Sequence, residues 1–334
     1  AALLLFNSAA SAAAEISSAG APAELTIRAL SATSLRVTLK PLTFAPALPE
    51  TPALVEREWP APSIRLRQID GVLNYRLGPL YVIIRDQPLM IDVSTRDGRV
   101  VQNILFRDDG RVSFRLDDRP VLGLGGGGPA MGENWREEPL EFDRRGRLHE
   151  MVPAWHNKAY GSRNPVPLVV GTAGWALFVN APWVQVDLRD SRRGEFIPWQ
   201  APAADARDEA SVQGRPPPES MVDGLFDFVI FDAAEPTALM ADIARITGHA
   251  AMPPKWALGY MQSHRTLKDD EQMIGIVDTF RARKLPIDAV IYLGTGFAPR
   301  GWNTEQPSYD FNPEVFTRPA EAVIEDLHRR HVKV

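Results

Sequence analysis

The chain has 334 residues, of which 45% are hydrophobic and 24% are charged, and its formal net charge is -5 at pH 7. This length is enough for more than one packed core. The acidic balance argues against a nucleic-acid partner, because phosphate-binding surfaces need clustered Lys and Arg. The absence of cysteine excludes disulfide bonds and thiolate metal sites, and no apolar run is long enough to span a membrane.

Residues 1–14 are typical of the end of a signal peptide. The apolar run Ala2–Phe6 precedes a stretch of small residues, in which Ala12-Ala13-Ala14 matches an A-x-A cleavage site. A basic n-region and an initiating Met are missing, so an Ala-rich disordered leader is the alternative. A signal peptide would make the protein secreted or periplasmic.

Residues 15–232 are predicted to form an antiparallel β-sandwich. Apolar and polar residues alternate in Leu35–Lys40, Ile64–Arg67 and Val112–Leu116, and turn signals such as Asp109-Gly110 divide the alternating runs. Many short strands with almost no helical pattern indicate a sandwich as a separate N-terminal domain.

Residues 233–253 are predicted to link this domain to the next. A short helix is expected from Pro236 to Gly248, because Leu239, Ile243 and Ile246 lie on one of its sides. The pair Pro253-Pro254 then marks the domain boundary.

Residues 254–334 predict strand, helix, strand, long loop, helix and the start of a third strand. The strands are expected at Lys255–Met261, at Ile287–Leu293 and from Val332. Such an order implies parallel pairing with right-handed crossovers, as in a doubly wound sheet or a (β/α)8 barrel. Because a barrel needs roughly 250 residues, a truncated barrel is predicted.

Two helices are expected between these strands. Thr266-Leu267-Lys268-Asp269 gives a capping-box signal in which Thr266 and Asp269 can satisfy free helix N–H groups, so the first helix should start there and stop before Pro286. The second should follow Pro319, with Val323, Ile324 and Leu327 marking its apolar side.

Three motifs favour structural roles. Gly123–Gly128 formally matches G-x-G-x-x-G, but Pro129 follows where a phosphate-binding helix should open, so a glycine-rich sandwich edge is expected. His328 and His331 lack further metal ligands nearby and fit a helix end. The acidic run Asp269–Glu271 suits a first helical turn on electrostatic grounds.

Six segments, in a fixed order, carry a resemblance to a known family. They are Leu122–Gly125, Phe142–Gly146, Pro167–Val179, Pro253–Ser263, Phe280–Asp288 and Asp310–Phe316. Their order and spacing resemble those of glycoside hydrolase family 31, the α-glucosidase and α-xylosidase group. The resemblance implies a galactose-mutarotase-like sandwich, then the first β/α units of a (β/α)8 barrel, and the retaining hydrolysis of terminal α-glycosidic bonds.

Retention requires two carboxyl groups beside the scissile bond. In the family both are aspartates on later barrel strands, which are expected beyond residue 334, so no catalytic residue is assigned here. The implied substrate is an oligosaccharide or another α-glycoside, with neither metal nor organic cofactor. An open barrel would expose a sheet edge, so the chain alone is expected to aggregate and to be inactive.

Polar side chains after the first two barrel strands are predicted to line the sugar pocket, because barrel sites are built at the carboxyl ends of strands. These candidate contacts are Gln262, His264, Arg265, Thr295, Arg300, Trp302 and Asn303. Trp302 offers a flat face to sugar C–H groups. For each residue, a role in shaping its loop is the alternative.

Two departures from the family pattern affect the expected specificity. The Asp-x-Asp that commonly ends the second strand is replaced by Leu293–Phe297, and Gly126 stands where the family has a Glu. Losing carboxylates removes charge-assisted hydrogen bonds to hydroxyls. A non-catalytic carbohydrate-binding or structural protein is therefore an alternative, whereas a mutarotase-like sandwich acting alone is poorly supported, since nothing pairs His149 or His156 with a Glu.

Overall fold

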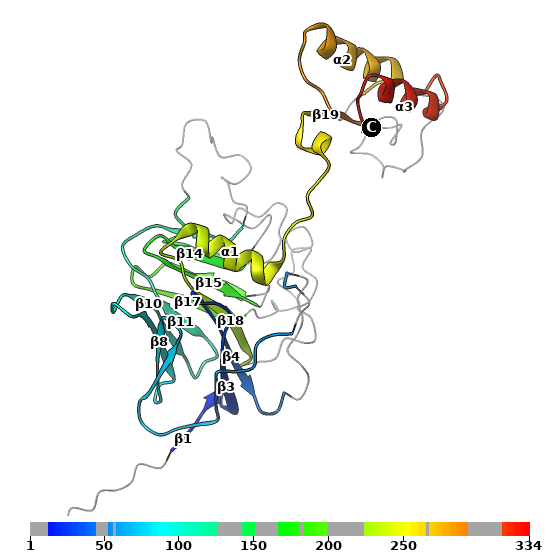
Figure 1. The fold of residues 1–334 in the computed structure, drawn as a ribbon. Coiled ribbons are helices and arrows are strands. Elements are labelled where there is room, and N and C mark those ends of the chain that lie inside the picture. The colour runs from blue at the N-terminus through cyan, green and yellow to red at the C-terminus, as the bar shows by residue number, and fades with distance from the viewer. Residues whose placement is uncertain are drawn as a thin grey trace, which may run out of the picture. The chain divides into compact units, whose positions relative to one another are not determined.

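The computed structural model describes residues 13–44, 53–55, 58–125, 142–150, 166–180, 184–198, 224–264, 267–292 and 316–334. The chain divides into two compact units, residues 1–249 and 250–334, and each is described by itself (Figure 1). In the described ranges, no helix has the length and apolar character needed to cross a membrane.

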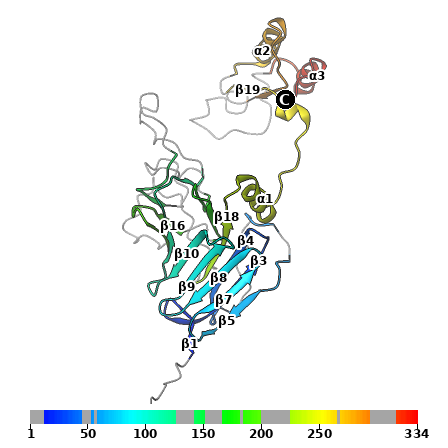
Figure 2. The same ribbon diagram turned by 60° about the vertical axis from the view of Figure 1, so that its left-hand side comes forward.

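The first unit is a sandwich of two antiparallel sheets (Figure 2). One sheet runs in the order β13 (Leu148–Glu150), β16 (Val184–Asp187), β17 (Arg193–Pro198), β11 (Val112–Arg115), β10 (Val100–Phe106), β9 (Met90–Thr95), β8 (Leu80–Arg85), β7 (Leu73–Leu77). The other runs β12 (Val121–Gly123), β14 (Leu168–Gly171), β15 (Trp175–Val179), β18 (Phe226–Asp232), β4 (Ser34–Pro41), β3 (Ala21–Ala29), β2 (Ser17–Ser18), with β5 (Ile64–Leu66) also paired to β3. A separate two-stranded antiparallel sheet is formed by β1 (Ala14–Glu15) and β6 (Gln68–Ile69). The predicted antiparallel sandwich is thus confirmed.

The core of the sandwich follows from the period of two in its strands. Alternate residues turn inward from both sheets, so that Val37 on β4 and Val93 on β9 are fully buried. Three aromatic rings fill the centre: Phe114 lies 4.6 Å from Phe196 and 6.0 Å from Trp175 between ring centroids. Burial of these apolar surfaces holds the two sheets together.

Helix α1 (Pro236–Thr247) covers the outer face of the second sheet beside β18. Its Leu239 and Ile246 pack with Phe178 and Phe231, which point away from the sandwich core. The predicted helix and its buried side are confirmed. The boundary between the two units falls just after this helix.

The second unit contains η1 (Lys255–Leu258), β19 (Met261–His264), α2 (Asp270–Ala282), β20 (Ala289–Tyr292) and α3 (Ala320–Arg329). Strands β19 and β20 are parallel, and Ala289 forms a further parallel bridge to Lys333. Two β/α units followed by the start of a third strand are therefore present, as predicted.

The predicted starts of both strands were wrong, and the second strand begins at Ala289 rather than Ile287. The first strand begins at Met261 rather than Lys255, because the chain after Pro254 makes a tight turn in which the Ala257 N–H donates to Pro254 O at 2.9 Å. Helix α2 begins at Asp270, since Asp269 is the N-cap and accepts from the Gln272 N–H at 2.8 Å. Thr266 lies outside the described residues.

Gly123 ends strand β12 at the edge of the second sheet. Its φ is 99°, and a Cβ at this position would lie 2.2 Å from the carbonyl oxygen of Leu168. Only glycine fits both the conformation and the close approach. The expected role of a glycine at a sandwich edge is confirmed for this residue, while Gly126–Gly128 lie outside the described residues.

Candidate functional site

The carboxyl ends of β19 and β20 form one continuous edge. In the parallel register Gln262 lies beside Val290, Ser263 beside Ile291, and His264 beside Tyr292. Both strands therefore end at the same level of the sheet. Such an edge is where barrel proteins build their sites.

The two faces of this small sheet differ in burial. Val290 and Tyr292 are buried on the side covered by α2 and α3, with Val277 and Leu327 among their neighbours in the core. On the other face Met261, Ser263 and Ile291 are exposed. The described residues of the second unit therefore leave Met261 and Ile291 exposed on this face.

Gln262 lies on the face that carries the helices. The ring of Tyr260, two residues earlier, stacks on Phe280 of α2 with centroids 5.3 Å apart. The Tyr260 hydroxyl donates to Gln262 Oε1 at 2.7 Å, and Gln262 Nε2 donates to Ser263 O at 2.9 Å. Half of the bonding capacity of this amide is thus engaged within the strand, and sugar contact by Gln262 stays a prediction.

The other predicted contacts are only partly described. His264 occupies the last position of β19, and its side chain lies outside the described residues. Arg265, Thr295, Arg300, Trp302 and Asn303 also lie outside them. The structure brings together the strand ends that these segments follow, and the contacts themselves stay predictions.

The chain is anchored on both sides of the segment 293–315, which connects β20 to the start of α3. Tyr292, which precedes it, packs edge-on against Phe316, which follows it, with ring centroids 5.0 Å apart. Burial, together with the nearby carboxylates of Asp269 and Asp270, raises the pKa of Tyr292 to about 12. The phenol therefore stays neutral at physiological pH.

Asp270 holds the residues just before α3 against the start of α2. Its fully buried carboxylate accepts hydrogen bonds at 3.2 Å from the Thr317 N–H, the Thr317 hydroxyl and Arg318 Nε. Burial pushes the pKa of Asp270 upward, but the bonds from Thr317 and Arg318 outweigh it, so the pKa lies below the usual range. From the sequence, the acidic run was explained by the helix dipole alone, and this role of Asp270 was not predicted. No local signal links Asp270 to Thr317, because the two residues are 47 positions apart.

Asp288 acts at the opposite, amino end of the strands. Its Oδ2 accepts from the Tyr260 N–H at 3.1 Å, while its own N–H donates to Tyr260 O at 2.9 Å. A Cβ on Gly259 would lie 2.1 Å from the same Oδ2. The one charged residue of the predicted second strand therefore ties β20 to the start of β19. Within the described ranges, no three His, Asp or Glu side chains are grouped to hold a metal.

An antiparallel sandwich followed by parallel β/α units is the order expected of a β-sandwich domain joined to a (β/α)8 barrel. Residues 250–334 match the model of the family 31 glycosyl hydrolase TIM-barrel domain. The predicted resemblance to glycoside hydrolase family 31 is thus confirmed for this part of the chain.

Named relatives agree with this assignment. The chain is 36% identical over 224 residues to alpha-glucosidase 2 of Bacillus thermoamyloliquefaciens, an alignment covering 64% of this chain and 25% of that protein. It is 32% identical over 90 residues to an alpha-xylosidase of Saccharolobus solfataricus, covering 27% of this chain and 12% of that protein. The chain thus spans a quarter or less of these relatives' lengths.

A solved structure shares the fold. The GH31 dextranase of Flavobacterium johnsoniae, complexed with glucose, superposes with a TM-score of 0.67 at 15% identity. The superposition covers 94% of this chain and 36% of the dextranase chain. It supports the order of sandwich and barrel units described above.

Proposed function

We propose that these residues form part of a retaining α-glycosidase that hydrolyses terminal α-glycosidic bonds. The observation that carries the proposal is the match of residues 250–334 to the family 31 barrel domain, in the unit whose β19 and β20 end at one edge. This edge would form part of the rim of the sugar pocket, with Trp302 and Asn303 as contacts.

The chemistry requires two carboxyl groups, one that attacks the anomeric carbon and one that protonates the leaving oxygen. We assign neither to the residues described here. Asp269, Asp270 and Asp288 are committed to capping α2, to holding Thr317 and to binding the Tyr260 N–H. The catalytic pair is proposed to come from later barrel strands, and these residues contribute the start of the barrel and part of the pocket rim.

The substrate class is an α-linked glucoside or xyloside. The named relatives are an alpha-glucosidase and an alpha-xylosidase, and the dextranase structure holds glucose. The stretch Leu293–Phe297 contains no carboxylate, so a substrate hydroxyl would lack a strong charge-assisted hydrogen bond at this position. We therefore propose a specificity that differs from that of a plain α-glucosidase.

The proposal is tested on the protein encoded by the complete reading frame that contains these residues. Aryl α-glucosides and α-xylosides serve as substrates, and proton NMR of the first product identifies the anomer. Release of the α-anomer supports retention, whereas release of the β-anomer contradicts it. Trp302→Ala should raise KM more than it lowers kcat if Trp302 binds the substrate in its ground state.

A non-catalytic carbohydrate-binding protein is the second candidate, favoured by the missing Asp-x-Asp at Leu293–Phe297. It predicts that the complete protein binds α-linked oligosaccharides but cleaves none. Export is a further proposal that rests on the leader-like residues 1–14. N-terminal sequencing of the protein recovered from the periplasm or culture medium would test it.

A further inference from the structure

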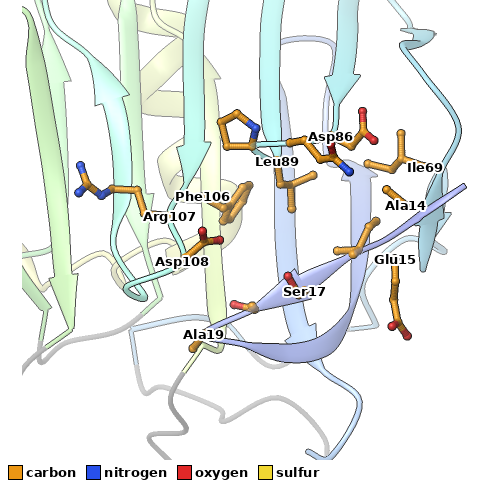
Figure 3. A pocket seen from close by; sticks show the side chains of 14 residues that line it. Ala14, Glu15, Ser17, Ala19, Ile69, Asp86, Leu89, Phe106, Arg107 and Asp108 are labelled. Atoms are coloured by element: carbon orange, nitrogen blue, oxygen red, sulfur yellow. The ribbon is translucent and has the colours of Figure 1, made fainter. Parts of the chain in front are cut away.

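A cavity of about 610 Å³ opens at one end of the sandwich (Figure 3). Residues 14–19 of the N-terminal strands bound it on one side, and the turns at 86–89 and 106–108 bound it on the other. Small-molecule sites typically measure about 300–1,000 Å³. The cavity is thus large enough for a sugar or a short oligosaccharide.

One part of the lining is apolar and belongs to the sandwich core. Ile16, Ile69 and Phe106 are at most 5% exposed. The Phe106 ring lies 6.1 Å from the rings of both Phe226 and Phe228. This wall is therefore fixed by core packing, and the partly buried Leu89 is its more accessible side chain.

The other part of the lining is polar. Asp108 and Ser17 approach the space from the turn after β10 and from the N-terminal strand (Figure 3). The carboxylates of Glu15, Asp86 and Asp108 make no ion pair or side-chain hydrogen bond with the other residues that the structure describes. Among the described residues, Asp86 and Asp108 thus keep their acceptor capacity at this cavity, while the Glu15 side chain extends away from Phe106 and Leu89 (Figure 3).

The side chain of Arg107 lines the same cavity but forms no ion pair with these carboxylates. Arg107 extends away from Ser17 and Asp108 (Figure 3), and its Nη1 donates to Glu195 Oε1 at 3.2 Å while its Nε donates to Asp109 Oδ1 at 3.3 Å. The lining therefore carries a net negative charge. An anionic ligand would be repelled, whereas neutral hydroxyl groups can donate to the carboxylates.

We propose that this cavity is a second carbohydrate-binding site, separate from the barrel edge, that takes one or two units of a neutral oligosaccharide. A sugar ring offers hydroxyl donors around its rim and C–H groups on its faces, which match the carboxylates and the wall formed by Phe106 and Leu89. The location rests on the cavity alone, and only the choice of α-linked sugars rests on the proposed function.

The test measures binding of maltotriose and isomaltotriose to residues 1–334 by ligand-observed saturation-transfer NMR, with titration to obtain Kd, at concentrations at which sedimentation velocity shows a monomer. Asp108→Ala and Asp86→Ala each remove one carboxylate from the cavity. Each should weaken binding about tenfold, the loss expected for one charge-assisted hydrogen bond. Asp118→Ala removes an exposed carboxylate from a turn outside the cavity and should leave Kd unchanged.

Thermal unfolding of each variant checks that it is folded. Two cavity variants are used so that the test still stands if one of them does not fold. Unchanged Kd in both cavity variants, or no binding by the wild type, would overturn the proposal. Calcium binding lost in Asp108→Ala, without sugar binding, would define a cation site and overturn it too. Hydrolysis by the complete protein is measured separately, so its absence rejects the proposed function while leaving the cavity result intact.

Discussion

The Asp270 carboxylate, at the first position of α2, accepts hydrogen bonds from both the backbone N–H and the hydroxyl of Thr317, just ahead of α3. Because Arg318 adds a third donor, one buried charge holds the ends of two consecutive barrel helices together. This contact also fixes the positions of Thr317 and Arg318 relative to α2.

Replacing this charge should destabilise the second unit. In Asp270→Asn the side chain keeps its size but loses the charge and presents an NH2 group that duplicates the donors around it. We expect a loss of about 2 kcal/mol in the free energy of unfolding, within the range for a buried hydrogen-bonded charge whose cationic partner is partly exposed. Urea titration of the second unit, followed by far-UV circular dichroism, measures it.

Glu271→Gln is the matched control, because it removes a carboxylate from the same helical turn at an exposed position. Its effect should stay within about 0.5 kcal/mol, as for a surface substitution. Equal losses in the two variants would show that the helix dipole, rather than the contact with Thr317, accounts for the stabilisation.

The same contact predicts a dependence of stability on pH. The pKa of folded Asp270 is depressed, whereas an unfolded Asp titrates near about 3.9. A depressed pKa stabilises the fold fully above the unfolded value, and this contribution is lost as the pH falls through the folded value. The difference in unfolding free energy between wild type and Asp270→Asn should therefore be constant at neutral pH and shrink below about pH 4. A difference that stays constant down to acid unfolding would contradict this.

The approach of Gly259 to Asp288 gives a prediction at the other end of the strands. A Cβ at residue 259 would lie 2.1 Å from Asp288 Oδ2, so Gly259→Ala must displace the carboxylate from the Tyr260 N–H. We expect a loss of about 1–3 kcal/mol, as for other overpacked sites. In the Asp288→Ala background the clash is absent, so the same substitution should cost much less. Additive losses in this double-mutant cycle would argue against the clash.

Local patterns were sufficient to predict most of the fold. The alternation in Leu35–Lys40 and Val112–Leu116 predicted β4 and β11, because one face of each strand had to enter the core. The side of α1 that carries Leu239 and Ile246 was found in the same way. These elements are determined by residues close together in the sequence.

Errors arose where a choice depended on backbone geometry or on distant partners. Two residues, Thr266 and Asp269, could both cap a helix, and the sequence could not show that Gln272 pairs with Asp269. The apolar run from Lys255 was predicted to be a strand, although its first four residues, Lys255–Leu258, form a 3-10 helical turn. At the candidate site, Asp270 was missed since its partners lie 47 and 48 residues away.

The first unit contains a buried ion pair whose energetics can be tested. Arg36 Nε and Nη2 donate to the two carboxylate oxygens of Asp227 at 2.8 and 2.5 Å, and Thr38 and Asn180 bond the same carboxylate. The Arg36 guanidinium also lies 4.4 Å from the centroid of the Trp59 ring. Each charge is thus desolvated and fully engaged.

Asp227→Leu should cost about 3–5 kcal/mol, because it leaves the Arg36 charge buried without a counterion. The double variant Arg36→Met/Asp227→Leu should recover much of that loss, since replacing both charges by apolar groups removes the desolvation penalty. Chemical denaturation of these two variants and of Arg36→Met completes the cycle. A double variant no more stable than Asp227→Leu would mean that Thr38 and Asn180 contribute the stabilisation, rather than the ion pair.

The open face of the β19–β20 sheet predicts self-association of residues 1–334. Ile291 is 42% and Met261 39% exposed, side by side with Ser263 on a face that the described residues do not cover. Exposed apolar patches of this kind drive association, so sedimentation velocity should show species larger than a monomer that grow with concentration. Ile291→Thr keeps a β-branched side chain but removes apolar surface, and it should shift the distribution toward the monomer. Leu285→Thr, which alters an equally exposed residue before β20, should have the smaller effect. If both variants behaved alike, general surface hydrophobicity rather than this face would cause the association.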